Sequence, residues 1–389
     1  MKKVAILGST GSIGCSTLSV IEANSDLFSV SLLAAESNSE LILKQGKNFN
    51  SKYFYLNNEF ASNHLNSQIN SLKLDSKVLN EEDYLNFIAS DEVDIVVAGI
   101  VGVAGLKPIH RALCSGKRVL LANKEAYVVA GELLNQMAER NNSTIFPIDS
   151  EHSAIHQCLS GNSDTSGGVK RIILTGSGGP FLNKDLSTFH QITPEEAVNH
   201  PIWNMGQKIS IDSSTMMNKG LEVIEAKWLF GIDSQKIEIL VHPEGIIHSL
   251  VEFEDSSLIA QLSLPDMKIP IAYGLGFPTR ISSNSERLNL EEMGSLNFSK
   301  PDLKKFPSIE IARSCLEAGG TAPSLLNAAN EEAVQAFLDK RIIFTQITEI
   351  IAFVMDTITT KAVKELETVF EADSLGRESA RNYIGKIQK

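Results

Sequence analysis

Hydrophobic and polar positions in the first third of the chain alternate between continuous apolar runs and stretches with helical spacing. After the first run, Ile13, Leu18 and Ile21 recur at the spacing of an amphipathic helix. Apolar strands that alternate with helices in this way are typical of a parallel sheet covered on both faces. We therefore expect an α/β fold that begins with a Rossmann-type, doubly wound parallel sheet. Its predicted strands lie at residues 4–7, 28–35, 93–106 and 117–129.

The pattern changes after residue 145. The apolar run 145–148 predicts a further strand, and we expect the chain to stay extended through Asp149 and Glu151. Ile209 and Ile211 alternate with polar residues and predict a strand, whereas Leu221, Ile224 and Leu229 mark a helix. We expect a central α+β catalytic domain here.

The C-terminal part has helical periodicity. Residues 279–307 are polar and interrupted by prolines, so they read as a long connection, and Ser308 is a potential cap for the helix that follows. We expect a small helical bundle that buttresses the rest. The predicted organisation is a dinucleotide-binding domain (1–149), a catalytic domain (150–278) with a lid loop (199–208), a connection (279–307) and a helical domain (308–389).

Composition narrows the class of protein. The 389 residues carry a formal net charge of −12, which argues against a nucleic-acid partner. No run reaches 18 apolar residues, so we expect no membrane span, and the first residues read as a strand rather than a signal peptide. Four dispersed cysteines indicate reduced thiols and a cytoplasmic location. They are Cys15, Cys114, Cys158 and Cys315.

Gly8, Gly11 and Gly14 form a glycine-rich turn between the first strand and its helix. Such a turn brings backbone N–H groups and a helix N-terminus to a pyrophosphate, although glycine turns also occur without a ligand. The surrounding sheet favours a bound dinucleotide over a purely structural domain. At the end of the second predicted strand stands Glu36, with no Lys or Arg beside it, which by itself favours NAD.

Asp149 and Glu151 are two carboxylates close together at the edge of a core. Neighbouring like charges raise each other's pKa unless a cation lies between them, so these residues indicate a hard-metal site. A solvated loop at a domain boundary is the alternative. Glu222, near the start of a predicted helix, is a candidate third ligand, but it also suits the helix dipole.

Three loops of the central region carry residues suited to binding a phosphate or to covering a site. Ser213, Asn218 and Lys219 offer hydrogen-bond donors and a cation, and the glycine-rich segment 174–181 contributes Ser177. Segment 199–208 suits a lid that excludes water, although its bulky residues are equally consistent with ordinary packing. This segment contains His200, Trp203 and Met205.

Together these motifs resemble the 1-deoxy-D-xylulose 5-phosphate reductoisomerase family. The resemblance extends from residue 1 into the C-terminal helices. It is carried by "GSTGSIG", "LLANKE", "PIDSEHSAI", "TGSGGPF", "HPIWNMG", "ISIDSSTMMNKGLEVIEA" and "LNAANEEAV", in that order.

The resemblance implies a role for each matching residue. Metal ligands would be Asp149, Glu151 and Glu222, which together with Lys124 near the reacting carbons would be the catalytic residues. Substrate-binding residues would be Lys124, Ser150, Glu151, Ser177, His200, Ser213, Asn218, Lys219 and Glu222. Cofactor contacts would be Thr10, Gly11, Ser12, Ile13, Asn38, Asn123, Glu125 and Gly206, with Met267 lining the nicotinamide side and Trp203 and Met205 in the lid.

The resemblance also implies the reaction. The ketone and the neighbouring hydroxyl of 1-deoxy-D-xylulose 5-phosphate would chelate a divalent metal, usually Mg²⁺ or Mn²⁺. The carbon skeleton of this substrate would then rearrange to an aldehyde, which NADPH would reduce to 2-C-methyl-D-erythritol 4-phosphate. The enzyme would belong to the non-mevalonate isoprenoid pathway and would be a homodimer. One departure stands out: Glu36 and Ser37 replace the glycine and the small or basic residue that the family commonly has there, which opposes a 2′-phosphate. We expect NADPH nevertheless.

Two alternatives remain at this point. One is another Rossmann dehydrogenase that acts on a phosphorylated hydroxy-aldehyde and holds a structural metal. The other is a non-catalytic dinucleotide sensor, which has no use for the carboxylates of "DSEH".

Overall fold

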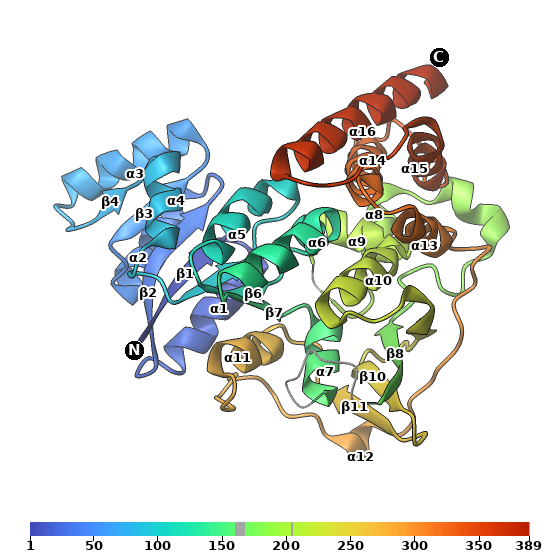
Figure 1. Ribbon diagram of the computed structural model, residues 1–389, viewed down its shortest axis with the longest axis horizontal. Helices are drawn as coiled ribbons and strands as arrows, with labels where there is room; N and C mark the ends of the chain where they lie inside the picture. The colour runs from blue at the N-terminus through green and yellow to red at the C-terminus, as the bar shows by residue number, and fades with distance from the viewer. Residues whose placement is uncertain (160–167, 204, 389) are drawn as a thin grey trace. The chain divides into compact units, whose positions relative to one another are not determined.

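The protein, seen here as a computed structural model of residues 1–159, 168–203 and 205–388, divides over this part of the chain into two compact units (Figure 1). Unit 1 contains residues 1–126, 134–153 and 266–286, and unit 2 contains 127–133, 154–265 and 287–389. The predicted domain boundaries follow sequence patterns rather than contacts and remain a prediction.

Unit 1 is built on a parallel sheet, as predicted. Among the described residues this sheet has seven strands in the order β4-β3-β2-β1-β5-β6-β7, and each neighbouring pair is parallel. Because the chain leaves β1 towards β2 and later returns to its other side as β5, the strand order reverses beside β1, where open α/β sheets bind ligands. The strands are β1 (Lys2–Leu7), β2 (Phe28–Ala35), β3 (Tyr53–Leu56), β4 (Lys77–Val78), β5 (Ile95–Ala98), β6 (Arg118–Leu121) and β7 (Thr144–Pro147).

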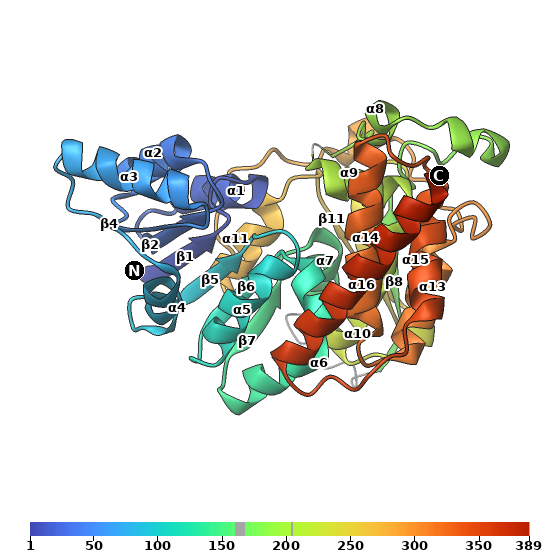
Figure 2. The same ribbon diagram turned by 90° about the horizontal axis from the view of Figure 1, so that it is seen from above.

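Helices cover both faces of this sheet: α2 and α3 lie on one face and α4 and α5 on the other (Figure 2). Asparagine side chains set the first residues of several of them, because Asn38, Asn58, Asn80 and Asn123 each accept a hydrogen bond from a backbone N–H of the first turn. The helices are α1 (Ser12–Glu22), α2 (Ser39–Phe49), α3 (Glu59–Ser71), α4 (Glu81–Ala89), α5 (Leu106–Leu113) and α11 (Lys268–Gly276).

Two helices contain residues of both units. Helix α6 (Lys124–Arg140) begins in unit 1 and has a non-helical residue at Ala130, and α7 (Ser150–Cys158) begins in unit 1 and ends in unit 2. Their first turns therefore belong to the same unit as the parallel sheet.

Unit 2 contains a mixed sheet whose order, among the described strands, is β11-β10-β8-β9. Only β8 and β9 are parallel in the described sheet; β10 runs antiparallel to both β8 and β11. The strands are β8 (Val169–Gly176), β9 (Ile237–Val241), β10 (Ile247–Phe253) and β11 (Leu258–Leu262).

One apolar core joins this sheet to the C-terminal helices. Its members include Leu174 of β8, Ile224 of α10 and Leu326 of α14, all completely buried. Helices α14 and α16 lie side by side (Figures 1 and 2). The helices are α8 (Pro194–Ala197), α9 (Gln207–Ser214), α10 (Met217–Phe230), α12 (Leu290–Met293), α13 (Ser308–Ala318), α14 (Ala322–Leu338), α15 (Gln346–Thr357) and α16 (Leu366–Ile387). The predicted bundle is thus confirmed as helices that share a core with the sheet.

Several local predictions were wrong. The strand predicted around Ile209 and Ile211 is helix α9, and the strand predicted over 117–129 ends at Leu121, with a helix from Lys124. Short alternating or apolar runs suit a buried helix as well as a strand, and packing decided between them. Ser308 is the first residue of α13, and its cap position is Pro307.

Within the described residues, no helix combines the length and the apolar content that a membrane crossing requires.

Candidate functional site

The first βα turn of unit 1 has the shape of a phosphate-binding turn. Gly8 has φ +85°, and a Cβ there would lie 2.6 Å from the carbonyl oxygen of Gly99. A Cβ on Gly14 would lie 2.4 Å from the carbonyl oxygens of both Gly8 and Ser9, so α1 packs on the turn only because this residue is glycine. The three glycines therefore differ in use, since Gly11 has an ordinary φ of −83°.

Helix α1 begins without a side-chain cap and has no acidic residue in its first turn. By contrast, α2, α3, α4 and α6 are all capped by asparagine. The first N–H groups of α1 and the positive end of its dipole are thus left to an anion. Thr10, Gly11, Ser12 and Ile13, the predicted cofactor contacts, lie in this turn.

The other predicted cofactor residues of unit 1 have structural partners. Asn123 is almost completely buried, caps α6 through the N–H of Ala126 at 2.9 Å and donates to the carbonyl oxygen of Gly102 at 2.9 Å. Asn38 caps α2 through the N–H of Leu41 at 3.1 Å. Glu125 is buried in the first turn of α6, and Met267 precedes α11. Their contact with a cofactor stays a prediction.

The carboxylate segment of unit 1 is a helix start rather than an extended strand. The backbone N–H of Ser153 donates to the carbonyl oxygen of Asp149 at 2.8 Å, and α7 runs from Ser150. Asp149 therefore stands just before the helix while Glu151 lies in its first turn, so the expectation of an extended segment with both side chains on one side was wrong. The Ser150 hydroxyl donates to the carboxylate of Glu151.

Asp149 lies against two basic groups. Lys124 Nζ is 2.7 Å from Asp149 Oδ2, and His152 Nδ1 is 3.7 Å from the same oxygen. Burial by itself would raise the pKa of Asp149, but Lys124 and His152 outweigh burial and hold its pKa well below the ordinary value. Sequence reasoning gave His152 no role; its position as the last letter of "DSEH", three residues after Asp149, was the available signal.

In unit 2 the helix α10 carries a buried ionic group. Glu222 accepts hydrogen bonds from Lys219 Nζ at 2.7 Å and from Asn218 Nδ2 at 2.6 Å, and it is completely buried. The predicted residues Asn218, Lys219 and Glu222 are thus brought together on one face of α10, as their spacing requires. The cap position of α10, Met216, is in the left-handed region with φ 59° and offers no side-chain acceptor.

The glycine segment after β8 packs directly against this group. A Cβ on Gly176 would lie 2.6 Å from Lys219 Cε, and one on Gly179 would lie 2.7 Å from the carbonyl oxygen of Ser213. Glycine at these positions makes room for the stem of Lys219 and for the end of α9. The predicted phosphate residues Ser213 and Lys219 therefore both adjoin the loop that carries Ser177.

Ser177 and His200 form a pair with a defined proton arrangement. His200 Nδ1 accepts hydrogen bonds from the backbone N–H groups of Ile202, at 3.2 Å, and Trp203, at 2.9 Å. Nδ1 therefore carries no proton in this arrangement, and Nε2, 3.1 Å from Ser177 Oγ, is the donor to that hydroxyl. Ser177 Oγ also accepts from the N–H of Gly179 at 3.2 Å, so its own hydrogen points elsewhere.

The predicted lid segment leads into α9. The ring of Trp203 lies near that of His248, with centroids 6.2 Å apart, and Gly206 occupies the cap position of α9. Met205 lies between them along the chain, while Asn204 is outside the described residues. The predicted lid loop therefore stops at Gly206, two residues before its predicted end, because α9 begins at Gln207.

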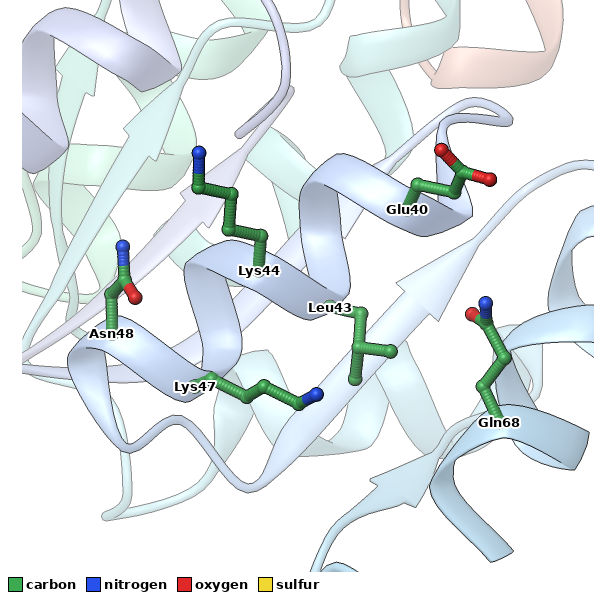
Figure 3. A pocket seen from close by; sticks show the side chains of 6 residues that line it. All are labelled: Glu40, Leu43, Lys44, Lys47, Asn48 and Gln68. Carbon is green, nitrogen blue, oxygen red and sulfur yellow. The ribbon is translucent and has the colours of Figure 1, made fainter. Parts of the chain in front are cut away.

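A small cavity of about 230 Å³ lies on unit 1 (Figure 3). Its walls come from α2 and α3, with Leu43 and Lys47 pointing toward Gln68, and do not include the glycine turn. Gln45 on the same helix does reach that turn and donates to the carbonyl oxygen of Ser9 at 2.8 Å. We assign the cavity no part in the reaction.

This sheet and its glycine turn are typical of α/β oxidoreductases that bind dinucleotides, and the chain also carries two groups of polar and charged residues, one around Asp149 and one around Glu222. Comparison with known proteins gives the family. Three family models match the chain. The model described as 1-deoxy-D-xylulose 5-phosphate reductoisomerase matches residues 4–131, and the model of the C-terminal domain of that enzyme matches residues 145–230. A third model, described as DXP reductoisomerase C-terminal domain, matches residues 262–379. The chain belongs to the 1-deoxy-D-xylulose 5-phosphate reductoisomerase family, and its reaction is the one for which the family is named.

Relatives and solved structures agree over the whole length. The 1-deoxy-D-xylulose 5-phosphate reductoisomerase of Janthinobacterium sp. (strain Marseille) is 46% identical over 388 residues, covering 99% of this chain and 100% of the relative. That of Cupriavidus pinatubonensis is 47% identical, covering 98% and 97%.

Among solved structures, a DOX-P reductoisomerase in complex with NADPH, fosmidomycin and magnesium has a TM-score of 0.95 and 40% identity, with complete coverage of both chains. The Zymomonas mobilis enzyme in complex with NADPH has a TM-score of 0.91 and 40% identity, covering 98% of each chain. Family membership decides against the sensor and the unrelated dehydrogenase.

Proposed function

We propose that the chain converts 1-deoxy-D-xylulose 5-phosphate to 2-C-methyl-D-erythritol 4-phosphate with NADPH and Mg²⁺ or Mn²⁺, in the non-mevalonate isoprenoid pathway. The observation that carries the residue assignment is the group on α10, where a buried Glu222 holds Lys219 and Asn218 against the glycine loop of Ser177. These residues combine a cation, an amide and a hydroxyl in one place.

The residues present fit a dinucleotide. The start of α1 has no side-chain cap, and Gly14 lets this helix pack on the glycine turn, so its first N–H groups are left for a pyrophosphate. We assign this role to Thr10, Gly11, Ser12 and Ile13, and further cofactor contacts to Asn38, Asn123, Glu125, Gly206 and Met267.

The carboxylates fit a hard divalent cation, because such ions take oxygen ligands. We propose Asp149, Glu151 and Glu222 as the ligands. Lys124 and His152 keep Asp149 ionised despite its burial, which suits it to bind a cation at neutral pH. The bound metal supplies a Lewis acid for the substrate's ketone and hydroxyl oxygens, and NADPH supplies the hydride.

Several side chains of this chain would bind and orient the substrate. The free hydrogen of Ser177, the ammonium of Lys219 and the amide of Asn218 would donate to the phosphate, with Ser213 beside them. Lys124 and Ser150 would contact the reacting end. Binding energy from the phosphate, remote from the reacting bonds, would then orient the carbon skeleton.

His200 would couple phosphate binding to the lid. Its Nε2–H reaches Ser177, while its Nδ1 holds the backbone of Ile202 and Trp203. Ordering of Ser177 on a phosphate would therefore order the segment of Trp203 and Met205, which would exclude water from the reacting carbons.

Finer properties are part of the same proposal. We place the enzyme in the cytoplasm, in line with four cysteines that are all free in the structure.

We also propose a homodimer: the edge strand β11 exposes Leu258, Ile259 and Leu262, and an apolar edge of this kind pairs readily with a second copy. Replacing Leu258→Lys should yield monomer by light scattering; an unchanged dimer would move the interface elsewhere.

The test is oxidation of NADPH, followed by absorbance, with 1-deoxy-D-xylulose 5-phosphate and Mg²⁺ or Mn²⁺. A chelator control and a parallel series with NADH accompany it. We expect turnover that requires the metal. Absence of turnover with either cofactor would overturn the proposal.

A further inference from the structure

Glu36 lies at the position where a parallel dinucleotide-binding sheet meets the adenosine ribose. It directly follows β2, and the carbonyl oxygen of Ala34 near the end of β2 accepts from the N–H groups of Gly8, at 2.9 Å, and Ser9, at 2.8 Å. The end of β2 is thus hydrogen-bonded to the glycine turn. An acid at this position accepts hydrogen bonds from the ribose hydroxyls of NAD.

The carboxylate of Glu36 is held in place. Asn57 Nδ2 lies 3.1 Å from each of the two Glu36 oxygens, and the Tyr55 hydroxyl donates to Asn57 Oδ1 at 3.3 Å. The backbone is tied as well, since Asn57 N donates to the carbonyl oxygen of Ala35 at 3.2 Å and Asn58 N to that of Glu36 at 2.9 Å. These contacts come from β3 and its end, so Glu36 is positioned by the sheet itself.

Among the residues that the structure describes, no cation is paired with this carboxylate. Residues 37–43 contain neither Lys nor Arg, and no ion pair involves Glu36 in the part of the chain that the structure describes. Asn38, two residues on, uses its side-chain oxygen to cap α2. A 2′-phosphate brought here would meet a fixed carboxylate without a compensating guanidinium or ammonium on this segment.

We infer that Glu36, positioned by Asn57, weakens the preference of this chain for NADPH over NADH by accepting from the adenosine ribose hydroxyls and opposing a 2′-phosphate. This inference rests on the proposed function and refines its cofactor. Asn57 is a positioning residue: its amide aims the carboxylate. The alternative is that Glu36 turns away from the nucleotide and has no effect.

The experiment measures binding of NADPH and NADH to the full chain without substrate, by the fluorescence of the reduced nicotinamide. Glu36→Gln keeps the size of the side chain and removes its charge. It should raise the ratio of NADPH to NADH affinity about tenfold or more, the effect of losing a hydrogen bond to a charged group together with its repulsion. Asn57→Ala should shift the ratio in the same direction but less, because the carboxylate remains.

Glu40→Gln is the matched control. Glu40 is an exposed acid four residues further on, at the edge of the cavity in Figure 3, and its replacement makes the same change in net charge. The ratio of NADPH to NADH affinity in Glu40→Gln should stay within about twofold of the ratio in the unchanged protein. Melting temperatures should show that all variants fold.

Two outcomes would overturn the inference: an unchanged ratio in Glu36→Gln, or an equal shift in Glu40→Gln, which would indicate bulk charge. Steady-state turnover separates this result from the proposed function. Metal-dependent turnover together with an unchanged affinity ratio in Glu36→Gln would contradict this inference but leave the proposed function intact. Lack of any turnover would contradict the proposed function, and the binding data would still decide the role of Glu36.

Discussion

At the scale of the residue, single glycines decide which groups meet. Gly14 lets α1 approach the first turn, and Gly176 lets the stem of Lys219 pass beside β8. In both cases the nearest atoms to a new Cβ would be about 2.4 to 2.6 Å away, well inside van der Waals contact. The sequence pattern marked both as glycine-rich turns, but the contacts explain why a larger residue does not fit.

Gly14→Ala should lower the free energy of unfolding by about 1–3 kcal/mol, the usual cost of overpacking. Gly11→Ala is the control, because its Cβ would lie 3.4 Å from the carbonyl oxygen of Gly8 and its φ is ordinary. Thermal and urea unfolding measure the difference. Equal stability of the two variants would show that the turn relaxes freely.

A second residue-level prediction concerns pH. Burial lowers the pKa of His156 from 6.5 to about 4. Between these values the unfolded chain binds the proton and the folded chain does not, so the contribution of His156 to stability falls as pH falls from 6.5 to 4. The slope is at most about 1.4 kcal/mol per pH unit.

His156→Gln should flatten the stability–pH profile across this window. The comparison of denaturant midpoints at several pH values isolates His156, because every other titratable group is the same in both proteins. Parallel profiles for the two proteins would contradict the prediction.

At the scale of the element, the helices of unit 2 are joined by ionic groups as well as by the apolar core. Arg377 of α16 binds Asp373 of its own helix at 2.7 Å and reaches Glu331 and Glu332 of α14. Burial by itself would lower the pKa of Arg377, but Asp373 and Glu331 outweigh burial and raise this pKa above its ordinary value. The group therefore helps to set how α16 lies on α14.

Arg377→Met should lower the free energy of unfolding by about 1–3 kcal/mol, because it leaves three partly buried carboxylates without their shared cation. Arg381→Met is the matched control: Arg381 also binds Glu332, at 2.7 Å, but its side chain is 63% exposed, so the loss should stay below about 1 kcal/mol. Urea unfolding followed by circular dichroism measures both. A larger loss of stability in Arg381→Met than in Arg377→Met would show that Arg381, and not Arg377, is the main ionic link between α14 and α16.

At the scale of the whole molecule, the proposed catalytic residues come from segments that are far apart in the sequence. Asp149 and Glu151 belong to unit 1, and Glu222 belongs to unit 2.

Asp149→Asn removes a proposed metal ligand while it preserves size. Turnover should fall by about a hundredfold or more, whereas NADPH affinity in the absence of substrate should stay unchanged. Steady-state rates over a range of Mg²⁺ concentration give the first quantity and nicotinamide fluorescence the second. Asp75→Asn, at a fully exposed acid of unit 1, should change neither, and normal turnover of Asp149→Asn would exclude it as a ligand.

The sequence by itself determined the parallel sheet, the glycine turn and the C-terminal helices, because long periodic patterns and fixed glycine spacings depend on local physics. The close pair of Asp149 and Glu151 indicated the candidate metal site, and the order of the motifs identified the family. It did not determine that 150–158 and 207–214 are helices, since short runs suit either element and tertiary packing selects one.

Only the tertiary structure revealed that His152 and Lys124 flank Asp149, that Gly176 makes room for Lys219, and that Asn57 holds Glu36. Each of these contacts joins side chains whose positions depend on how neighbouring strands and helices pack. Burial, charge pairing and steric room follow from that packing, and no local pattern in the chain encodes them.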